Sequence, residues 1–405
     1  MTEINLPIEF KEALPILERI IEAGHEAYFV GGSVRDLILG HKIHDVDVAT
    51  SAFPEEVKQI FPRTIDVGIE HGTVLVLDKE HQYEVTTFRT ESTYQDYRRP
   101  DEVVFVRSLE EDLKRRDFTM NALAMTTNGD IIDLFNGIKA IEDRVIVAVG
   151  DAFERFNEDA LRMMRALRFS SQLDFEIESH TKMAILNNHE LLSKIAIERI
   201  YVEWVKLLMG DSREKGLRAF VETKCHTQCP NLEMKEFELM AFSKINPLMK
   251  LDSEEIAWLC LFIALDVTSA KTFLSPWKVS KKLSQVTQDA LVMYSKRLDS
   301  DWTADMLYHS GVDVISLVEQ ARAFFGLAYN VEASLELYQS LPIKQLKDLN
   351  ITGSELAKEL GKTPGPWLGK LLKKLEANVL HEDIENTYVE LVNTAKKEGN
   401  RDDSL

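Results

Sequence analysis

The chain of 405 residues is 45% hydrophobic and 28% charged. This composition suits two to four folded domains and excludes collagen-like, low-complexity and globally disordered proteins. Its 67 acidic and 48 basic side chains give a formal net charge of −19, a field that repels polyanions at long range and argues against a nucleic-acid partner. Only the positions of the basic residues can decide that point.

The N-terminal sequence, MTEINLPIEF, has no basic segment followed by an apolar stretch, and the densest apolar run, residues 258–265, is far too short to cross a bilayer. We therefore expect a cytoplasmic protein that does not enter a membrane. Three cysteines give no disulfide framework and suit a reducing compartment. Cys225, His226 and Cys229 have no second pair downstream, which is too few ligands for a zinc site.

The first third of the chain alternates strand and helix patterns. Residues 26–30 predict a strand, residues 34–40 a short helix, and residues 44–50 (HDVDVAT) a strand with a period of two. Pro54 is typical of the first turn of another helix. Two hairpins are predicted, 73–78 with 83–88, and 122–127 with 130–135 through Asn128-Gly129.

Residues 89–106 are polar, rich in tyrosine and arginine, and have neither period, so we expect a mobile loop there. Ser108 and Glu111 then form a capping-box pattern for a helix running toward Arg116. Beyond about residue 138 apolar residues recur three and four apart, which predicts a mostly helical remainder. We place the domains at 1–138, 139–210, 211–310 and 311–405.

A double glycine marks the first candidate site. Gly31, Gly32 and Ser33 lie between a predicted strand and a predicted helix, with Arg35 one turn further on. Free backbone N–H groups and the helix dipole at such a turn can hold a phosphate. The pattern matches neither the phosphate-loop nor the dinucleotide fingerprint, so a purely structural turn is the alternative.

Paired carboxylates mark the second candidate site. Asp45 and Asp47 flank Val46 on a predicted strand, so both carboxylates point to one face. Two like charges this close favour a cation, and hard oxygen ligands favour Mg²⁺. Glu84, on the neighbouring hairpin, is a candidate third carboxylate. Solvated, exposed strand residues are the alternative for all three.

Two further clusters are basic. Lys114, Arg115 and Arg116 precede Asp117 at a helix end, where they either complement the helix dipole or contact a nucleotide's ribose and phosphates. The second cluster repeats at helical spacing and comprises Glu158, Asp159, Arg162, Arg165 and Arg168. Ion pairs within one helix are the plain interpretation. Three arginines outnumber two carboxylates, however, which indicates a bound anion.

The order of these motifs resembles that of one enzyme family. GGSVRDLILG, DVDVAT, HGTVLV, EVTTFR, LKRRDFTMNALAM, DRVIVAVGDAFERFNEDALRMMRALRF and IERIYVEW follow one another as in class II tRNA nucleotidyltransferases of the bacterial CCA-adding type, and GKTPGPWLGKLL resembles that family's tail. The resemblance implies an α/β nucleotidyltransferase head of the polymerase-beta type, followed by all-α neck, body and tail domains. It also implies template-independent addition and repair of the 3′-terminal CCA of tRNA from CTP and ATP, with Mg²⁺ as cofactor and pyrophosphate as product.

The resemblance also implies roles for the candidate residues. Asp45 and Asp47 would bind catalytic Mg²⁺, with Glu84 as the third carboxylate. ATP or CTP would be bound by Gly32, Ser33, Arg35, Arg116, Asp117, Glu158, Asp159, Arg162, Arg165 and Arg168. Within that set, the first three would meet the triphosphate, Asp117 the ribose, and Asp159 with Arg162 the base. Ala196 stands where the family has a serine, which affects only a helix cap.

Hydrogen-bond polarity explains how such a site chooses bases. Cytosine and adenine both present an amino donor beside a ring acceptor, whereas uracil and guanine present a carbonyl beside an N–H donor. An ionised Asp159 next to the protonated Arg162 complements the first two bases and repels the others, so no template is required.

Three alternatives remain open at this point: a poly(A) polymerase of the same superfamily, a partial enzyme adding only CC or only A, and a catalytically inactive RNA-binding protein. HGTVLV, in place of an arginine-rich stretch, favours the tRNA enzyme. In the family it resembles, CC-only addition goes with a shortened loop, so the long segment at 89–106 argues against that activity. The presence of both Asp45 and Asp47 argues against inactivity. The sequence leaves the oligomeric state open, a homodimer included.

Overall fold

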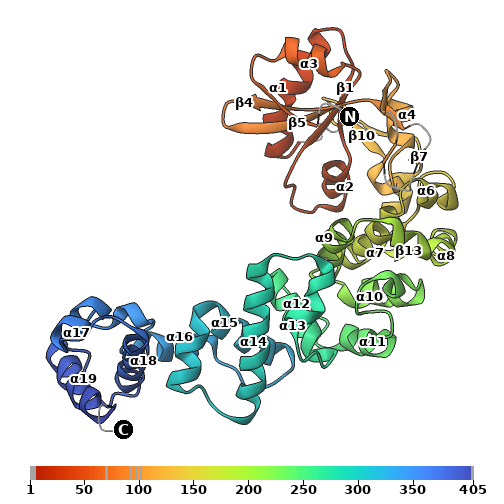
Figure 1. Ribbon diagram of the computed structural model, residues 1–405. Coiled ribbons are helices and arrows are strands. Elements are labelled where there is room, and N and C mark those ends of the chain that lie inside the picture. Colours follow the sequence, from red (N-terminus) through yellow and green to blue (C-terminus); the bar gives the residue numbers. More distant parts are fainter. Residues whose placement is uncertain (1–5, 69–71, 92–93, 96–98, 101–102, 403–405) are drawn as a thin grey trace. The chain divides into compact units, whose positions relative to one another are not determined.

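A computed structural model describes residues 6–68, 72–91, 94–95, 99–100 and 103–402 of the chain. The chain forms two compact units, Met1–Lys250 and Leu251–Leu405 (Figure 1). The first carries every candidate site residue. His71 of the HGTVLV motif and residues 92–93, 96–98 and 101–102 of the predicted loop lie outside the described residues.

The first unit begins with a seven-stranded mixed sheet in the order β11-β10-β1-β2-β5-β4-β3. Its strands are β1 (Ala27–Val30), β2 (Asp47–Thr50), β3 (Thr64–Gly68), β4 (Thr73–Asp78), β5 (His81–Thr87), β10 (Leu123–Met125) and β11 (Ile131–Asp133). β2 and β5 are parallel, and the other neighbours are antiparallel. The predicted α/β head and both predicted hairpins are confirmed.

Short helices accompany the sheet: α1 (Ile8–Glu22), α2 (Gly32–Leu39), α3 (Pro54–Ile60), α4 (Leu109–Lys114) and α5 (Gly137–Glu142). α1 buries Phe10, Ala13 and Leu17 at helical spacing, and Phe10 packs edge-on against Phe29 of β1 with ring centroids 4.9 Å apart. Ser108 caps α4 by accepting from the backbone N–H of Glu111 at 3.4 Å, as its sequence pattern predicts.

The predicted strand at 44–50 is shorter than expected, because β2 begins at Asp47 and Asp45 lies in the connection before it. The alternation nevertheless persists: Val46 is buried, while Asp45 and Asp47 are both exposed. The two aspartates therefore differ in burial from the residue between them even without a complete strand.

The segment 89–106, expected to be a loop, contains short strands where the structure describes it. β6 (Arg89–Glu91) pairs antiparallel with β9 (Val103–Phe105), and β7 (Tyr94–Gln95) pairs with β8 (Arg99–Pro100). A two-stranded ribbon can form through backbone hydrogen bonds alone, so it leaves no apolar alternation in the sequence. We call residues 89–106 the arm.

Helices make up the rest of the first unit: α6 (Ala152–Glu158), α7 (Leu161–Leu173), α8 (Ser179–Asn188), α9 (Ile197–Leu208), α10 (Arg213–Glu222) and α11 (Glu236–Lys244). Two short strands accompany these helices: β12 (Val145–Ile146), before α6, pairs in parallel with β13 (Glu176–Ile177), between α7 and α8. α7 packs against α9 and α10, and the rings of Trp204 and Phe220 lie 4.8 Å apart between the latter two. The predicted change from mixed to helical structure is confirmed.

The second unit is helical: α12 (Glu254–Ala264), α13 (Ala270–Leu274), α14 (Lys281–Asp299), α15 (Ala304–Phe324), α16 (Val331–Ser340), α17 (Gly353–Glu359), α18 (Pro366–Leu380) and α19 (Tyr388–Asp402). Gly311, with φ of 66°, kinks α15. Glu319 is fully buried, and it accepts hydrogen bonds from Arg297 and Trp302, so its charge is paired. In the part of the chain that is described, no helix is long and apolar enough to cross a membrane.

Candidate active site

Three carboxylates meet where β2 and β5 run side by side. The parallel register pairs Val48 with Val85, and extending it by one residue sets Asp47 beside Glu84. Asp45 precedes β2 in the same connection. Among the residues that the structure describes, none makes an ion pair or side-chain hydrogen bond with these three carboxylates.

This crowding changes the acidity of Asp47. Its side chain reaches solvent in the cavity, but protein atoms surround it on most sides and remove much of its hydration. This desolvation is the main cause that raises its pKa to about 6, the charges of Glu84 and Asp45 raise it further, and Arg116 opposes them. A nearby cation would restore the ionised form. Within the described ranges, no three His, Cys, Asp or Glu side chains close around a metal ion by themselves. This arrangement fits Mg²⁺, which takes one or two carboxylates and completes its shell with water and substrate phosphates.

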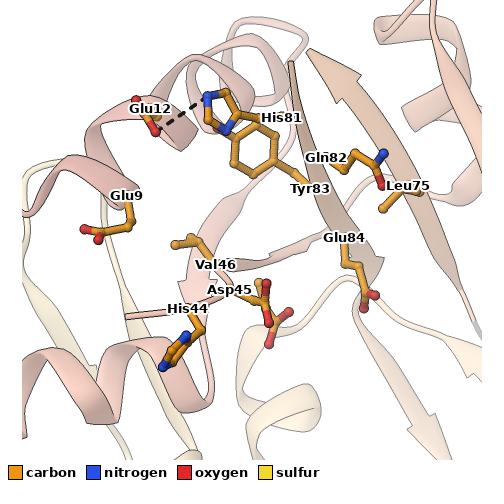
Figure 2. A pocket seen from close by; sticks show the side chains of 11 residues that line it. Glu9, Glu12, His44, Asp45, Val46, Leu75, His81, Gln82, Tyr83 and Glu84 are labelled. Atoms are coloured by element: carbon orange, nitrogen blue, oxygen red, sulfur yellow. Dashed lines mark ion pairs between the residues drawn. The ribbon is translucent and has the colours of Figure 1, made fainter. Parts of the chain in front are cut away.

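The carboxylates line a cavity of about 560 Å³, which we call the acidic cavity. In the view of Figure 2, Asp45 and Glu84 lie below the pair formed by His81 and Glu12. In that pair, Nε2 of His81 lies 3.7 Å from Oε2 of Glu12. Asp47 also lines this cavity.

A second cavity, of about 660 Å³, is lined by residues of the β1–α2 turn, of the arm and of α7 and α9. We call it the cationic cavity. Its basic side chains are Arg35, Arg89, Arg115, Arg116, Arg162, Arg165, Arg168, Arg199 and Lys206, and its acidic ones are Asp47, Asp117 and Asp159. Nine cations against three carboxylates suit a polyanion such as a triphosphate. Because Asp47 lines both cavities, the acidic and cationic cavities adjoin.

The double-glycine turn enters the cationic cavity because its first residue has no side chain. Gly31 has φ of 76°, and a Cβ there would lie 3.1 Å from Nη1 of Arg116 and 3.8 Å from Oδ2 of Asp47. Gly32 and Arg35 line the cavity. Ser33 does not: its buried hydroxyl donates to the carbonyl of Val30 at 3.2 Å.

Buried acids orient the basic run at 114–117. Asp112, 1% exposed, accepts from Nε of Arg115 at 2.9 Å and from Nη2 of Arg116 at 3.0 Å. Burial acts to raise its pKa, but the two guanidiniums lower it overall. Asp117 forms an ion pair with Arg165, whose Nη2 lies 2.6 Å from Oδ2, and its other oxygen accepts from Asn121 at 3.2 Å.

The helix predicted from residue 158 onward is interrupted. α6 ends at Glu158 and α7 begins at Leu161, which leaves Asp159 in an extended conformation between them. Its Oδ1 accepts from the N–H of Leu161 at 3.0 Å, and its Oδ2 accepts from Nη2 of Arg199 at 3.0 Å. These two bonds fix the carboxylate of Asp159 at the wall of the cationic cavity.

Arg162 is 7% exposed and lines the same cavity. Its Nη1 lies 2.7 Å from Oε2 of Glu158, and its Nη2 donates to the carbonyl of Arg115 at 3.1 Å. Glu158 does not line the cavity itself but holds both Arg155 and Arg162.

The expectation that three arginines on α7 leave unbalanced charge is wrong for the helix itself, because each has a carboxylate partner. Arg162 pairs with Glu158, Arg165 with Asp117, and Arg168 with Glu203. Two of these partners lie far away in the sequence, so helical spacing could not reveal them. The positive excess belongs instead to the whole cationic cavity, to which several elements contribute.

Sequence reasoning missed three cations of that cavity: Arg89, Arg199 and Lys206. The first two lie inside the motifs EVTTFR and IERIYVEW, so the motifs themselves pointed to them. Of the candidate residues, the acidic cavity gathers Asp45, Asp47 and Glu84, while the cationic cavity gathers Gly32, Arg35, Asp47, Arg116, Asp117, Asp159, Arg162, Arg165 and Arg168.

Three family models match the chain. Residues 27–147 match the poly(A) polymerase head domain, residues 174–235 an RNA- and SrmB-binding region of polymerase A, and residues 249–395 domain 2 of tRNA nucleotidyltransferases. The first match covers the sheet and both of its hairpins.

Whole-chain relatives agree with these matches. The chain is 51% identical to the CCA-adding enzyme of Enterococcus faecalis over 97% of each chain, and 50% identical to that of Ligilactobacillus salivarius over 97% of this chain and 98% of the relative. Among solved structures, the Bacillus stearothermophilus CCA-adding enzyme in complex with CTP is 40% identical, has a TM-score of 0.90, and covers 98% of this chain and 100% of its own.

Proposed function

The chain belongs to the CCA-adding enzymes, the class II tRNA nucleotidyltransferases, and from this membership we propose how its residues carry the family's reaction. CMP and AMP are transferred from CTP and ATP to the 3′ end of tRNA without a nucleic-acid template, which completes or repairs CCA. In each step the terminal 3′-oxygen bonds to the α-phosphorus, its proton is lost, and pyrophosphate leaves. The observation that carries the proposal is the adjoining of an acidic and a cationic cavity at Asp47.

Asp45 and Asp47 are the proposed Mg²⁺ ligands, with Glu84 as the third carboxylate. Mg²⁺ bound there would lower the pKa of the attacking hydroxyl and stabilise the leaving pyrophosphate. The raised pKa of Asp47, caused by desolvation and by the two neighbouring carboxylates, supports this assignment. The three carboxylates would hold the Mg²⁺ ion beside the α-phosphorus that is attacked.

The cationic cavity is the proposed nucleotide site. First-turn N–H groups of a helix have no partner within the helix, so those of Gly32 and Ser33 suit phosphate oxygens, as do the guanidiniums of Arg35 and Arg116. Arg165 and Arg168 add charge from α7. Asp117, fixed by Arg165, is the proposed ribose contact.

Base selection is proposed for Asp159 and Arg162, supported by Glu158. The carboxylate of Asp159 would accept from the exocyclic amine of cytosine or adenine, and Arg162 would donate to the adjacent ring nitrogen. In the structure, Arg199 orients Asp159 and Glu158 orients Arg162. A bound base would therefore compete with the carbonyl of Arg115 for the guanidinium of Arg162.

The roles of the domains and the location of the enzyme complete the proposal. The head at 1–138 is catalytic, the neck at 139–210 selects the base, and the body at 211–310 and tail at 311–405 bind tRNA by shape and local phosphate contacts. The enzyme acts in the cytoplasm. Its oligomeric state stays open, and light scattering coupled to gel filtration distinguishes the mass of one chain from that of a homodimer.

The test of the function uses tRNA transcripts that end before CCA, after C and after CC. Each is incubated with CTP, ATP, UTP and GTP, separately and together. We expect CTP to extend the first two transcripts to CC, ATP to extend only the third, and the CTP–ATP mixture to complete CCA with release of pyrophosphate.

Other outcomes would separate the alternatives. Extension by ATP alone into a long tail would indicate a poly(A) polymerase. Extension of the CC transcript without extension of the others would indicate an A-adding enzyme. No extension, with tRNA still bound, would indicate an inactive RNA-binding protein.

A further inference from the structure

One aromatic side chain lies among the arginines of the cationic cavity. Phe169, on α7, is 6% exposed and lines the cavity. The guanidinium carbon of Arg168 lies 4.1 Å from the centre of its ring, that of Arg35 lies 5.2 Å away, and that of Arg165 lies 5.5 Å away. The three cations therefore share one ring, although Arg35 belongs to α2 of the head.

These cations repel one another at close range. Burial is the first cause that lowers the pKa of Arg168 to about 10, and the charges of Arg165 and Arg35 also lower it, while Glu203 raises it. The ion pair with Glu203 is imperfect: Nε and Oε2 lie 3.1 Å apart, yet neither atom has a hydrogen-bond partner. The negative face of an aromatic ring attracts guanidinium groups and so offsets this repulsion.

The ring also has a fixed position of its own. Phe169 meets Phe118 edge-on, with ring centroids 6.0 Å apart, and Phe118 is fully buried directly after Asp117. A rigid, buried ring in contact with three flexible side chains limits where their charged ends can go.

We propose that Phe169 is a positioning residue that sets the spacing of Arg35, Arg165 and Arg168, and thereby determines how tightly the cationic cavity binds the phosphates of the incoming nucleotide. The inference rests on the proposed function, because it takes a nucleoside triphosphate as the ligand. It goes further by assigning an uncharged side chain a part in phosphate binding, and by linking a head arginine to the two neck arginines through one ring.

The test compares three variants with the parent. Phe169→Leu removes the ring, and Phe169→Tyr keeps it. Phe175→Leu is the matched control: Phe175 is fully buried and its ring lies 5.5 Å from the guanidinium of Arg144, but it does not line the cavity. Calorimetric titration with inorganic pyrophosphate and with CTP measures binding, and steady-state kinetics separate KM from kcat.

We expect Phe169→Leu to weaken binding of pyrophosphate and CTP by about tenfold and to raise KM for both CTP and ATP, which corresponds to the loss of cation–π contacts. Phe169→Tyr should stay within about threefold of the parent. Phe175→Leu should lower the Tm without changing either affinity. If Phe169→Leu is unstable, Phe169→Met, which preserves volume without a ring, should give the same loss.

Parent-like affinities in Phe169→Leu and Phe169→Met would overturn the inference, as would equal losses in the Tyr variant or in the Phe175 control. Failure of the parent itself to bind pyrophosphate or CTP would instead overturn the proposed nucleotide site. The two failures are therefore distinguishable.

Discussion

Asp47 lies where the acidic and cationic cavities adjoin. It is the first residue of β2, lies opposite Val30, and lines both cavities. A Cβ at Gly31 would lie only 3.8 Å from its Oδ2, so a phosphate held at the glycine turn and a cation held by Asp47 would be neighbours. Its raised pKa means that the surrounding protein disfavours the charged form of Asp47, which a bound cation would stabilise.

Replacing Asp45 or Asp47 by Asn removes a negative ligand charge and preserves shape. Both variants should fold normally and lose addition of C and A together, by at least about a hundredfold in single-turnover rate. Glu84→Gln should show the same loss to a smaller degree. Glu9→Gln removes a different carboxylate from the acidic cavity and should leave the rate unchanged. Near-normal turnover of Asp45→Asn in Mg²⁺ would contradict the metal assignment.

Asp117 gives a pH prediction. Burial would raise its pKa, but the Arg165 charge and bonds from Asn121 and the Phe118 N–H bring it from 3.8 down to about 2. The unfolded chain therefore takes up the proton first, and about 2 kcal/mol of stability present above pH 4 is lost as the pH falls toward 2. Urea unfolding should show Asp117→Asn less stable at pH 7, with the difference narrowing between pH 4 and 2. A difference that stays constant over this range would rule out the ion pair as its source.

At the scale of elements, the arm connects the active site to the rest of the head. Arg89, at its start, lines the cationic cavity. At its end, the ring centroid of Phe105 lies 6.1 Å from that of Phe53. Just after the arm, the guanidinium carbon of Arg107 lies 4.3 Å from the centre of the Phe53 ring, and Arg107 donates to Glu56 at 3.0 Å. Both ends of the arm are thus held by contacts with the head.

The cationic cavity must accept first a pyrimidine and then a larger purine. We propose that the arm changes the shape of this cavity between the two steps.

Replacing residues 92–102 by Asn-Gly, a two-residue hairpin turn, keeps Arg89 and the pairing of β6 with β9. This variant should still add CC but lose addition of A. Deletion of the whole arm at 89–106 also removes Arg89 and should lower both steps. Gel analysis of products from transcripts ending before CCA and at CC measures each step. Equal losses in the shortened variant would exclude a switching role.

A helix cap supplies a prediction about stability. Ala196 is the N-cap residue directly before α9, and it makes no side-chain hydrogen bond to the first turn of the helix. Ala196→Ser should add such a bond and raise the free energy of unfolding by about 1 kcal/mol without changing catalysis. Thermal unfolding of the two proteins measures this, and an unchanged or lower Tm would contradict it.

Local patterns account for what could be predicted from the sequence. The hairpins β4–β5 and β10–β11 have a period of two and defined turns, and α3 and α4 have Pro54 and Ser108 at their starts. The arm escaped prediction because its strands pair without apolar alternation. Arg199 and Glu203 escaped because their partners lie on other segments: Asp159 lies between α6 and α7, and Arg168 lies on α7. Such contacts depend on the packing of α7 against α9, which no local spacing reveals.

At the scale of the whole molecule, charge is unevenly distributed. The chain carries a net charge of −19, yet nine basic side chains line one cavity. The overall field disfavours non-specific binding of polyanions, while the local excess favours a triphosphate. The argument from composition against a nucleic-acid partner therefore applies to the average charge of the chain. Binding at the site depends on the local charge of the cationic cavity. The central claim is that side chains of this cavity replace a template.

That claim is tested most directly by single-turnover incorporation of all four nucleotides, with the parent and with Asp159→Ala, on a tRNA ending before CCA. Glu176→Ala, which removes an exposed ion-pair partner of Arg218, is the control for a lost carboxylate. Asp159→Ala should slow C and A and relax the rejection of U and G by about 1 to 3 kcal/mol, with little change in Tm. An Asp159→Ala enzyme that rejects UTP and GTP as strongly as the parent would contradict the account.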